Sequence, residues 1–125
     1  MRIQPTTKNT LDCWVDADFV GLYGKENPQD PSSTRSQTGY VICLGDNPVF
    51  WQSKLQTITA LHTMETEYIA TSGAMKSLLF LQRVHKEICT GFGLPFDSKS
   101  NVSTIFEDNQ AALLLATTDP PCLTP

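Results

Sequence analysis

Three acidic side chains stand where carboxylates could share a divalent cation. Asp16 falls near the end of a segment with strand periodicity, Glu67 lies in a helical segment, and Asp108 stands between a β-prone and a helical segment. Mg²⁺ prefers oxygen ligands, usually one or two carboxylates with phosphate oxygens completing its shell. Two such ions about 4 Å apart can activate water in phosphodiester cleavage. The alternative is structural: single acids at such positions are also typical of solvated strand ends and helix caps.

Glu67 is the most unusual of the three acids. At about 100° per residue, it falls inside the apolar arc of its helix, whereas Glu65 lies outside that arc. A carboxylate on the sheet-facing side of a helix is costly unless it is paired or metal-bound. The neighbouring Ala70 and Ala74 are small enough to let the helix approach a sheet closely. The expected arc consists of Ala60, Leu61, Met64, Tyr68, Ala70, Ala74, Met75, Leu78, Leu79 and Leu81.

The first half of the chain is rich in strand signals. Residues 11–19 alternate apolar and polar, which predicts a strand, and residues 21–39 are a long loop dense in Gly, Pro, Ser and Asp. Two β-rich runs, 40–44 and 49–52, flank Gly, Asp, Asn and Pro at 45–48. This pattern predicts a hairpin.

The second half of the chain predicts helices around a further strand. Residues 57–61 are either a short strand or the approach to a helix, and residues 63–89 are helical, with a break near Gly73 as an alternative. Glycines and a proline after residue 90 are helix stop signals. Residues 102–106 predict a strand, and Asp108 or Asn109 can cap a helix over 110–116.

These elements indicate one α/β domain, of the α+β type with a mixed sheet and helices packed on it. We expect a polar tail at 1–10, the domain at 11–117 and a Pro-rich tail at 118–125. A chain of 125 residues cannot hold two cores of ordinary size. No apolar run approaches the roughly 18 residues of a membrane span, and the polar start predicts no secretion signal.

Charge and cysteine content narrow the classes of function. The net charge of −4 argues against strong binding of a nucleic-acid backbone by this chain alone. Its bases look scattered along the sequence, which points to metal ions or a basic neighbour for any such role. The four cysteines form no C-x-x-C pair, so we expect thiols in a reducing compartment and no zinc site. The scattered bases are Lys54, Lys76, Arg83, Lys86 and Lys99, and the cysteines are Cys13, Cys43, Cys89 and Cys122.

Four blocks of sequence carry a family resemblance. VDADFVG (15–21), SQTGYVICLGDNPVFWQSKLQT (36–57), ALHTMETEYIATS (60–72) and EDNQAALLLA (107–116) resemble the ribonuclease H region of copia-type LTR retrotransposon Pol polyproteins. The blocks occur there in the same order with similar gaps, and the resemblance covers about residues 11–116.

The resemblance implies a ribonuclease H-like fold, with three antiparallel strands, a parallel fourth and helices on the sheet. It also implies a site for two Mg²⁺ ions, with Mn²⁺ as an alternative, in which Asp16, Glu67 and Asp108 are catalytic and metal-binding residues. Asp18 is expected near the site rather than as a ligand. His62 and Thr66 depart from the family, which usually has Ser and Ala there.

The implied activity is metal-dependent hydrolysis of the RNA strand of RNA–DNA hybrids, leaving a 5′-phosphate and a 3′-hydroxyl. The implied partners are the hybrid and the reverse transcriptase region of the same polyprotein, with no membrane. The expected location is a cytoplasmic virus-like particle or the nucleus, not the exterior.

Two alternatives remain open at the level of sequence. One is a non-catalytic, transposon-derived fragment, and the other is a module that keeps the fold and only binds nucleic acid or a polymerase. The family's region continues into a basic segment, a further strand and a helix with a fourth acid. We therefore expect a C-terminally truncated domain that aggregates easily and shows little or no cleavage with Mg²⁺.

Overall fold

The computed structural model describes residues 9–18, 35–96, 101–110 and 114. The expected tails, most of the long loop and most of the helix over 110–116 lie outside these residues, and the domain bounds stay a prediction. Gln110 and Leu114 are helical. The described elements follow in the order β1 (Leu11–Asp18), β2 (Gln37–Leu44), β3 (Asn47–Leu55), α1 (Thr63–Gly91) and β4 (Ile105–Phe106).

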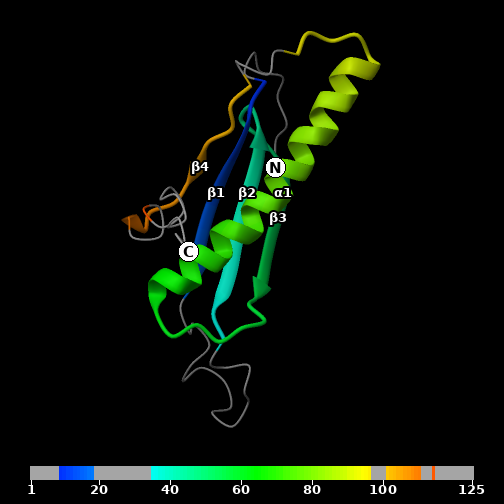
Figure 1. The fold of residues 1–125 in the computed structure, drawn as a ribbon. Helices are drawn as coiled ribbons and strands as arrows, with labels where there is room; N and C mark the ends of the chain where they lie inside the picture. The colour runs from blue at the N-terminus through cyan, green and yellow to red at the C-terminus, as the bar shows by residue number, and fades with distance from the viewer. Residues whose placement is uncertain (1–8, 19–34, 97–100, 111–113, 115–125) are drawn as a thin grey trace, which may run out of the picture.

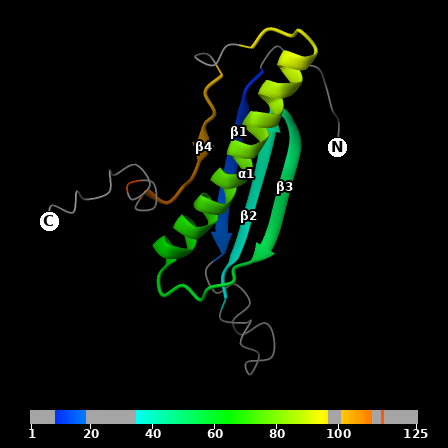
Figure 2. The same ribbon diagram turned by 45° about the vertical axis from the view of Figure 1, so that its right-hand side comes forward.

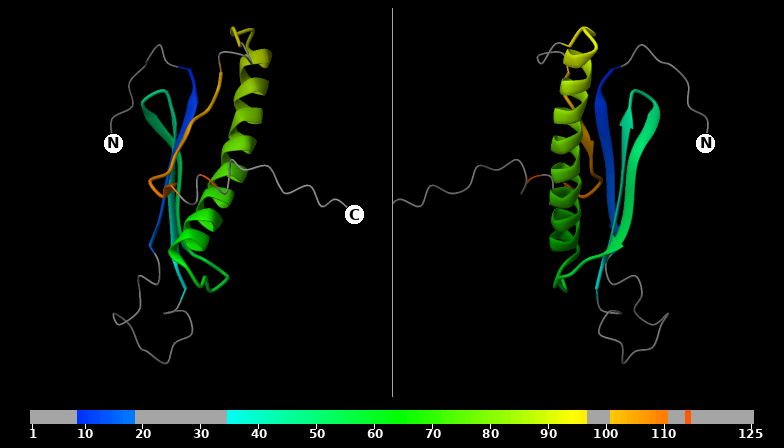
Figure 3. Two further views of the ribbon diagram at one scale, coloured as in Figure 1. Left: turned by 60° about the vertical axis from the view of Figure 1, so that its left-hand side comes forward. Right: turned by 90° about the vertical axis from the view of Figure 1, so that its right-hand side faces the viewer.

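The four strands form one mixed sheet in the order β3-β2-β1-β4. β1 pairs antiparallel with β2, β2 pairs antiparallel with β3, and β4 runs parallel to β1 (Figure 1). α1 covers one face of this sheet, so the described part of the molecule has two layers (Figure 3). The predicted mixed architecture is confirmed, and it is compatible with a ribonuclease H-like fold.

β1 alternates as its sequence predicts, with one exception. Cys13 and Val15 are buried beneath α1, whereas Trp14 and Asp16 are exposed on the other face. Asp12, expected on the polar face, is only 4% exposed. Its carboxylate accepts a hydrogen bond from the backbone N–H of Thr104. Asp12 therefore helps to fix the segment that leads into β4.

The hairpin is longer, and its turn shorter, than the sequence predicts. β2 begins at Gln37, inside the expected loop, because its first residues pair with β1 and β3. The turn consists of Gly45 and Asp46 alone, and Gly45 has a φ of 63°, a conformation that costs glycine little. Pro48 belongs to β3, at the register shift opposite Ile42 and Cys43. An edge strand tolerates a proline at such an irregularity.

α1 is one continuous helix of 29 residues, and Gly73 does not break it. Residues 57–61 approach this helix without forming a strand. The helix ends at Gly91, where the N–H of Phe92 bonds to the carbonyl of Ile88 and Gly93 has a φ of 66°. The predicted stop signals are confirmed.

The buried stripe of α1 is narrower than the expected apolar arc. Ala70 and Ala74 are fully buried against the sheet, and Leu78 continues the same stripe. The large side chains of the expected arc are instead partly exposed on the outer surface: Met64, Tyr68, Met75 and Leu79. They are exposed because only one layer of sheet lies beneath the helix, and small residues bring its axis close to that layer.

Polar bonds join the beginning of α1 to the sheet. Gln56 is buried, and its side-chain amide donates to Thr38 Oγ1 and to the carbonyl of Thr66. The Thr66 hydroxyl, which has no counterpart in the alanine usual in the resembled family, lies 3.1 Å from Ser36 Oγ. Because both hydroxyls are buried, this bond satisfies groups that would otherwise be costly.

We expect Gln56→Ala to lower the free energy of unfolding by about 2 kcal/mol, because the change leaves a buried hydroxyl and a carbonyl without a donor. Urea denaturation followed by circular dichroism measures this difference. The matched control is Gln37→Ala, which removes an exposed bond to Ser53 and should cost less than about 0.5 kcal/mol. Equal losses in the two variants would contradict the role of Gln56.

His62 is the N-cap of α1 and makes no side-chain capping bond. Serine at an N-cap accepts a hydrogen bond from the first helical turn. We expect His62→Ser to raise the free energy of unfolding by about 1 kcal/mol. A thermal melt shows this as a higher Tm, and an unchanged or lower Tm would argue against a capping deficit.

Candidate metal centre

Strand register brings Asp16 and Asp108 to the same level. Cys13 pairs with Ile105 and Trp14 with Phe106 in the parallel β1–β4 ladder. The ring stack of Trp14 and Phe106, with centroids 5.0 Å apart, reinforces this register. The same offset continued for two residues places Asp108 beside Asp16. The paired ladder itself ends at Trp14 and Phe106, two residues before these acids.

Glu67 reaches the same place from α1. The helix begins at the end of the sheet where β1 finishes (Figure 2). Glu67 lies one turn before Ala70 on the buried stripe, and its side chain is 5% exposed. The close contact of Ala70 and Ala74 with the sheet therefore carries the Glu67 carboxylate toward the end of β1.

The carboxylates of Asp16, Glu67 and Asp108 each offer an oxygen atom, and these oxygens all lie within 4.8 Å of one another. Such a group could hold a metal ion. The donors are all hard oxygens, as Mg²⁺ or Mn²⁺ prefers. Glu67 Oε2 is buried without a hydrogen-bond partner among the described residues. A buried carboxylate oxygen in this state is suited to bind a cation.

The described cysteines do not contribute to this cluster. Cys13, Cys43 and Cys89 are buried and form no disulfide bond with one another. Burial raises the pKa of Cys13 to about 11, with the neighbouring Cys43 adding to the shift. A thiol with such a pKa is a poor source of the thiolate that zinc requires. Cys122 lies outside the described residues.

The pKa of Glu67 is raised to about 7. Burial is the largest cause, followed by repulsion from the carboxylates of Glu107, Asp16 and Asp108 and by a hydrogen bond with Glu107. Without a cation, Glu67 is thus about half protonated at pH 7 and mostly protonated at lower pH. A divalent ion would reverse this preference by compensating the charge.

Glu107 is an acid at the site that the sequence reasoning did not single out. Its Oε2 accepts a hydrogen bond from the Thr71 hydroxyl, at 2.9 Å, and its Oε1 accepts one from the Asn109 N–H, at 3.1 Å. These bonds tie the segment after β4 to α1 and hold Asp108 in place. The available signal was its position beside Asp108, together with Thr71 one turn after Glu67.

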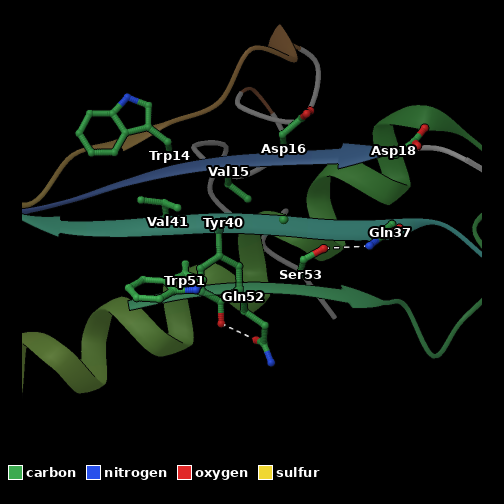
Figure 4. A pocket seen from close by; sticks show the side chains of 11 residues that line it. Trp14, Val15, Asp16, Asp18, Gln37, Tyr40, Val41, Trp51, Gln52 and Ser53 are labelled. Atoms are coloured by element: carbon green, nitrogen blue, oxygen red, sulfur yellow. Dashed lines mark hydrogen bonds between the residues drawn. The ribbon is translucent and has the colours of Figure 1, made fainter. Parts of the chain in front are cut away.

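Asp18 does not join the cluster. It lies with Asp16 along a hollow of about 560 Å³ on the open face of the sheet. Figure 4 shows Trp14 and Trp51 at one end of this hollow and Asp18 with the hydrogen-bonded pair Gln37 and Ser53 at the other. Asp16 thus faces both the cluster and an open surface next to it.

We expect the stability of the metal-free protein to fall as the pH rises from about 4.5 to about 7. The unfolded carboxyl of Glu67 loses its proton near 4.5, whereas the folded one keeps it to about 7, so the unfolded state is favoured increasingly across this interval. The loss is complete above pH 7.

The variant Glu67→Gln removes this penalty. Compared with the wild type, it should gain roughly 2 kcal/mol of relative stability between pH 4 and pH 8 in EDTA. Denaturation at several pH values measures the gain. A difference between variant and wild type that does not change with pH would mean that Glu67 has an ordinary pKa.

Comparisons with known proteins place the sequence near a class of transposon protein. No protein-family model matches the chain, and no solved structure does. Over 78 residues, or 62% of its length, it is 36% identical to the Retrovirus-related Pol polyprotein from transposon TNT 1-94 of Nicotiana tabacum. Over 68 residues, or 54% of its length, it is 38% identical to Secreted RxLR effector protein 161 of Plasmopara viticola.

The matched stretches make up 5% of the polyprotein and 42% of the effector protein. The chain thus spans less than half the length of either relative. No helix among the described residues has both the length and the apolar character needed to cross a membrane. Sequence similarity shows that the chain is homologous to a segment of a retrotransposon Pol polyprotein.

Proposed function

We propose that this chain is a ribonuclease H domain of a copia-type retrotransposon Pol polyprotein and hydrolyses the RNA strand of RNA–DNA hybrids. The convergence of Asp16, Glu67 and Asp108 carries this proposal. Each comes from a different element, and the three meet at the strand ends where ligand sites of open α/β sheets collect. The homology to a Pol polyprotein supports the same assignment.

The three carboxylates differ in burial, and we assign their roles in metal binding from this difference. Asp16 and Asp108 are exposed and present oxygens to the outside, whereas the buried Glu67 presents its oxygens from beneath. Mg²⁺ or Mn²⁺ held by these three carboxylates would supply an activated water and neutralise charge on the phosphate. Asp16 also faces the hollow on the sheet, so it can orient a strand that enters from that side.

RNA–DNA hybrid and the reverse transcriptase region of the same polyprotein are the proposed partners. In a hybrid, contacts with 2′-hydroxyls across the shallow minor groove distinguish the RNA strand from DNA. The product of attack by water on phosphorus is a 5′-phosphate and a 3′-hydroxyl. A polymerase partner would bring the hybrid to a chain whose own net charge is −4.

A second candidate is a module that keeps the site and binds nucleic acid without turnover. The similarity to a protein named as a secreted effector favours it, because related sequence occurs in a protein that is not named as a Pol polyprotein. Metal-dependent binding of hybrid without any cleavage would select this candidate over the nuclease.

We expect Mg²⁺ or Mn²⁺ to raise the Tm of the wild type, because a ligand that binds only the native state adds stability. Asp108→Asn should abolish this rise while leaving the metal-free protein equally or more stable, since it relieves repulsion around Glu67. Differential scanning fluorimetry with and without EDTA measures both effects. The matched control, Asp46→Asn, changes an exposed acid in the β2–β3 turn and should keep the full metal response.

The same proteins are then tested on a 5′-labelled RNA–DNA hybrid. Cleavage of the RNA strand by the wild type and by Asp46→Asn, however slow, should depend on divalent metal and stop in EDTA, whereas Asp16→Asn and Asp108→Asn should lose at least about a hundredfold in rate. Cleavage that survives in Asp108→Asn, or a wild type without any metal response, would exclude the proposed site.

A further inference from the structure

A second hollow lies on the other flank of α1. Its volume is about 490 Å³, and its lining comes from β2, β3, the segment after β3 and α1. None of the three clustered acids belongs to it. Where the metal cluster faces β1 and the segment after β4, this groove, here called the β3 groove, faces the edge strand β3.

Two lysines from different elements line the β3 groove. Lys54 stands on β3 and Lys76 on α1, and no Asp or Glu is part of the lining. Neither lysine forms an ion pair with a carboxylate of the described residues. Lys54 and Lys76 are 22 positions apart in the sequence, which is why they look scattered there. Folding therefore creates a local positive charge on a chain of net charge −4.

The lining of the β3 groove also supplies uncharged donors. Tyr40 donates its hydroxyl hydrogen to Gln52 Oε1, at 2.7 Å, and its oxygen lies 2.8 Å from Ser77 Oγ. This network orients Gln52 with its amide nitrogen away from Tyr40 (Figure 4), so that this group can donate to a ligand. Ser72 and Tyr68 line the same groove.

The β3 groove also contains an open stretch of helix surface at Gly73 and an exposed aromatic ring at Tyr68. A Cβ added at Gly73 would meet no atom within 4 Å, so this part of the helix surface is open. Tyr68 is 42% exposed and offers a ring on which a nucleobase can stack. Lysines, hydroxyl and amide donors and an aromatic ring along one groove are the features that hold a single nucleic-acid strand.

We infer that the β3 groove binds the phosphodiester backbone of a nucleic-acid strand, without any divalent metal. Lys54 and Lys76 contact phosphates, Gln52 and Ser72 donate to phosphate oxygens, and Tyr68 stacks on a base. The volume exceeds what one phosphate would fill, which favours a strand over the free ion. This inference is separate from the proposed function, because it involves neither the acids nor a metal.

The test measures binding of a fluorescein-labelled oligothymidylate by fluorescence anisotropy in EDTA, over a series of salt concentrations. We expect the double variant K54Q/K76Q to bind about tenfold more weakly at low salt, and the slope of log K against log salt to flatten by about 1 to 2. The control R83Q/K86Q loses two charges from the part of α1 that lines a different pocket. It should keep most of the affinity.

A steric variant separates the β3 groove from charge alone. Gly73→Leu fills the open space and should also stabilise the helix, since leucine is a better helix former than glycine. We expect weaker oligonucleotide binding together with an equal or higher Tm. Asp46→Asn, which changes an exposed acid outside both the β3 groove and the acidic cluster, should bind the oligonucleotide about as the wild type does. Because binding is measured in EDTA and needs no cleavage, failure of the metal site and failure of the β3 groove give different results.

Three outcomes would overturn the inference. The first is an equal loss in K54Q/K76Q and R83Q/K86Q, which would indicate net charge without a site. The second is full binding by Gly73→Leu. The third is displacement of the oligonucleotide by inorganic phosphate or by a polyglutamate peptide at the same concentration of charge, which would assign the β3 groove to free phosphate or to an acidic peptide.

Discussion

The close contact between α1 and the sheet is the constraint on which the rest of the structure depends. Ala70 and Ala74 have no exposed surface, and they let the helix axis approach β1 more closely than larger side chains would. Glu67 is one turn away on the same stripe, so this approach also sets the depth of its carboxylate. A bulky residue at either alanine would lift the helix and carry Glu67 away from Asp16. The packing of α1 on the sheet thus also determines the position of Glu67 relative to Asp16.

This arrangement is electrostatically unfavourable in the metal-free protein, because it gathers carboxylates around a buried acid. Glu67 is buried among carboxylates, and one of its oxygens has no partner in the described structure. Proteins break the rules of local stability mainly at functional sites. Nearby hydrogen bonds fix the segments around these carboxylates. The Thr71 hydroxyl and the Asn109 N–H donate to the Glu107 carboxylate, and the Thr104 N–H donates to the Asp12 carboxylate. These bonds oppose a movement of the segment around Asp108 away from α1 and β1.

The two flanks of α1 have opposite chemical character. The acidic cluster lies toward β4, and its negative charge would repel a phosphate unless a cation is bound. Toward β3 lies the groove of Lys54 and Lys76, which can attract a phosphate directly. A single helix separates them. A nucleic-acid strand would meet a metal-dependent surface on one flank and a metal-independent surface on the other.

The sequence by itself indicated most of the elements, and it singled out the three acids whose carboxylates the fold brings together. Period-two alternation marked β1, glycines and proline marked the end of α1, and the helical arc marked Glu67 as out of place, because each of these signals is local. Only the tertiary structure decided which side chains of α1 are buried, since that depends on the single layer beneath it. It also decided the start of β2, because pairing with two neighbouring strands extends this strand. The role of Glu107 depends on the fold as well, because its partner Thr71 is 36 positions away in the sequence. The pairing of Lys54 with Lys76 across one groove is of the same kind, because charges far apart along a chain become neighbours only when the chain folds.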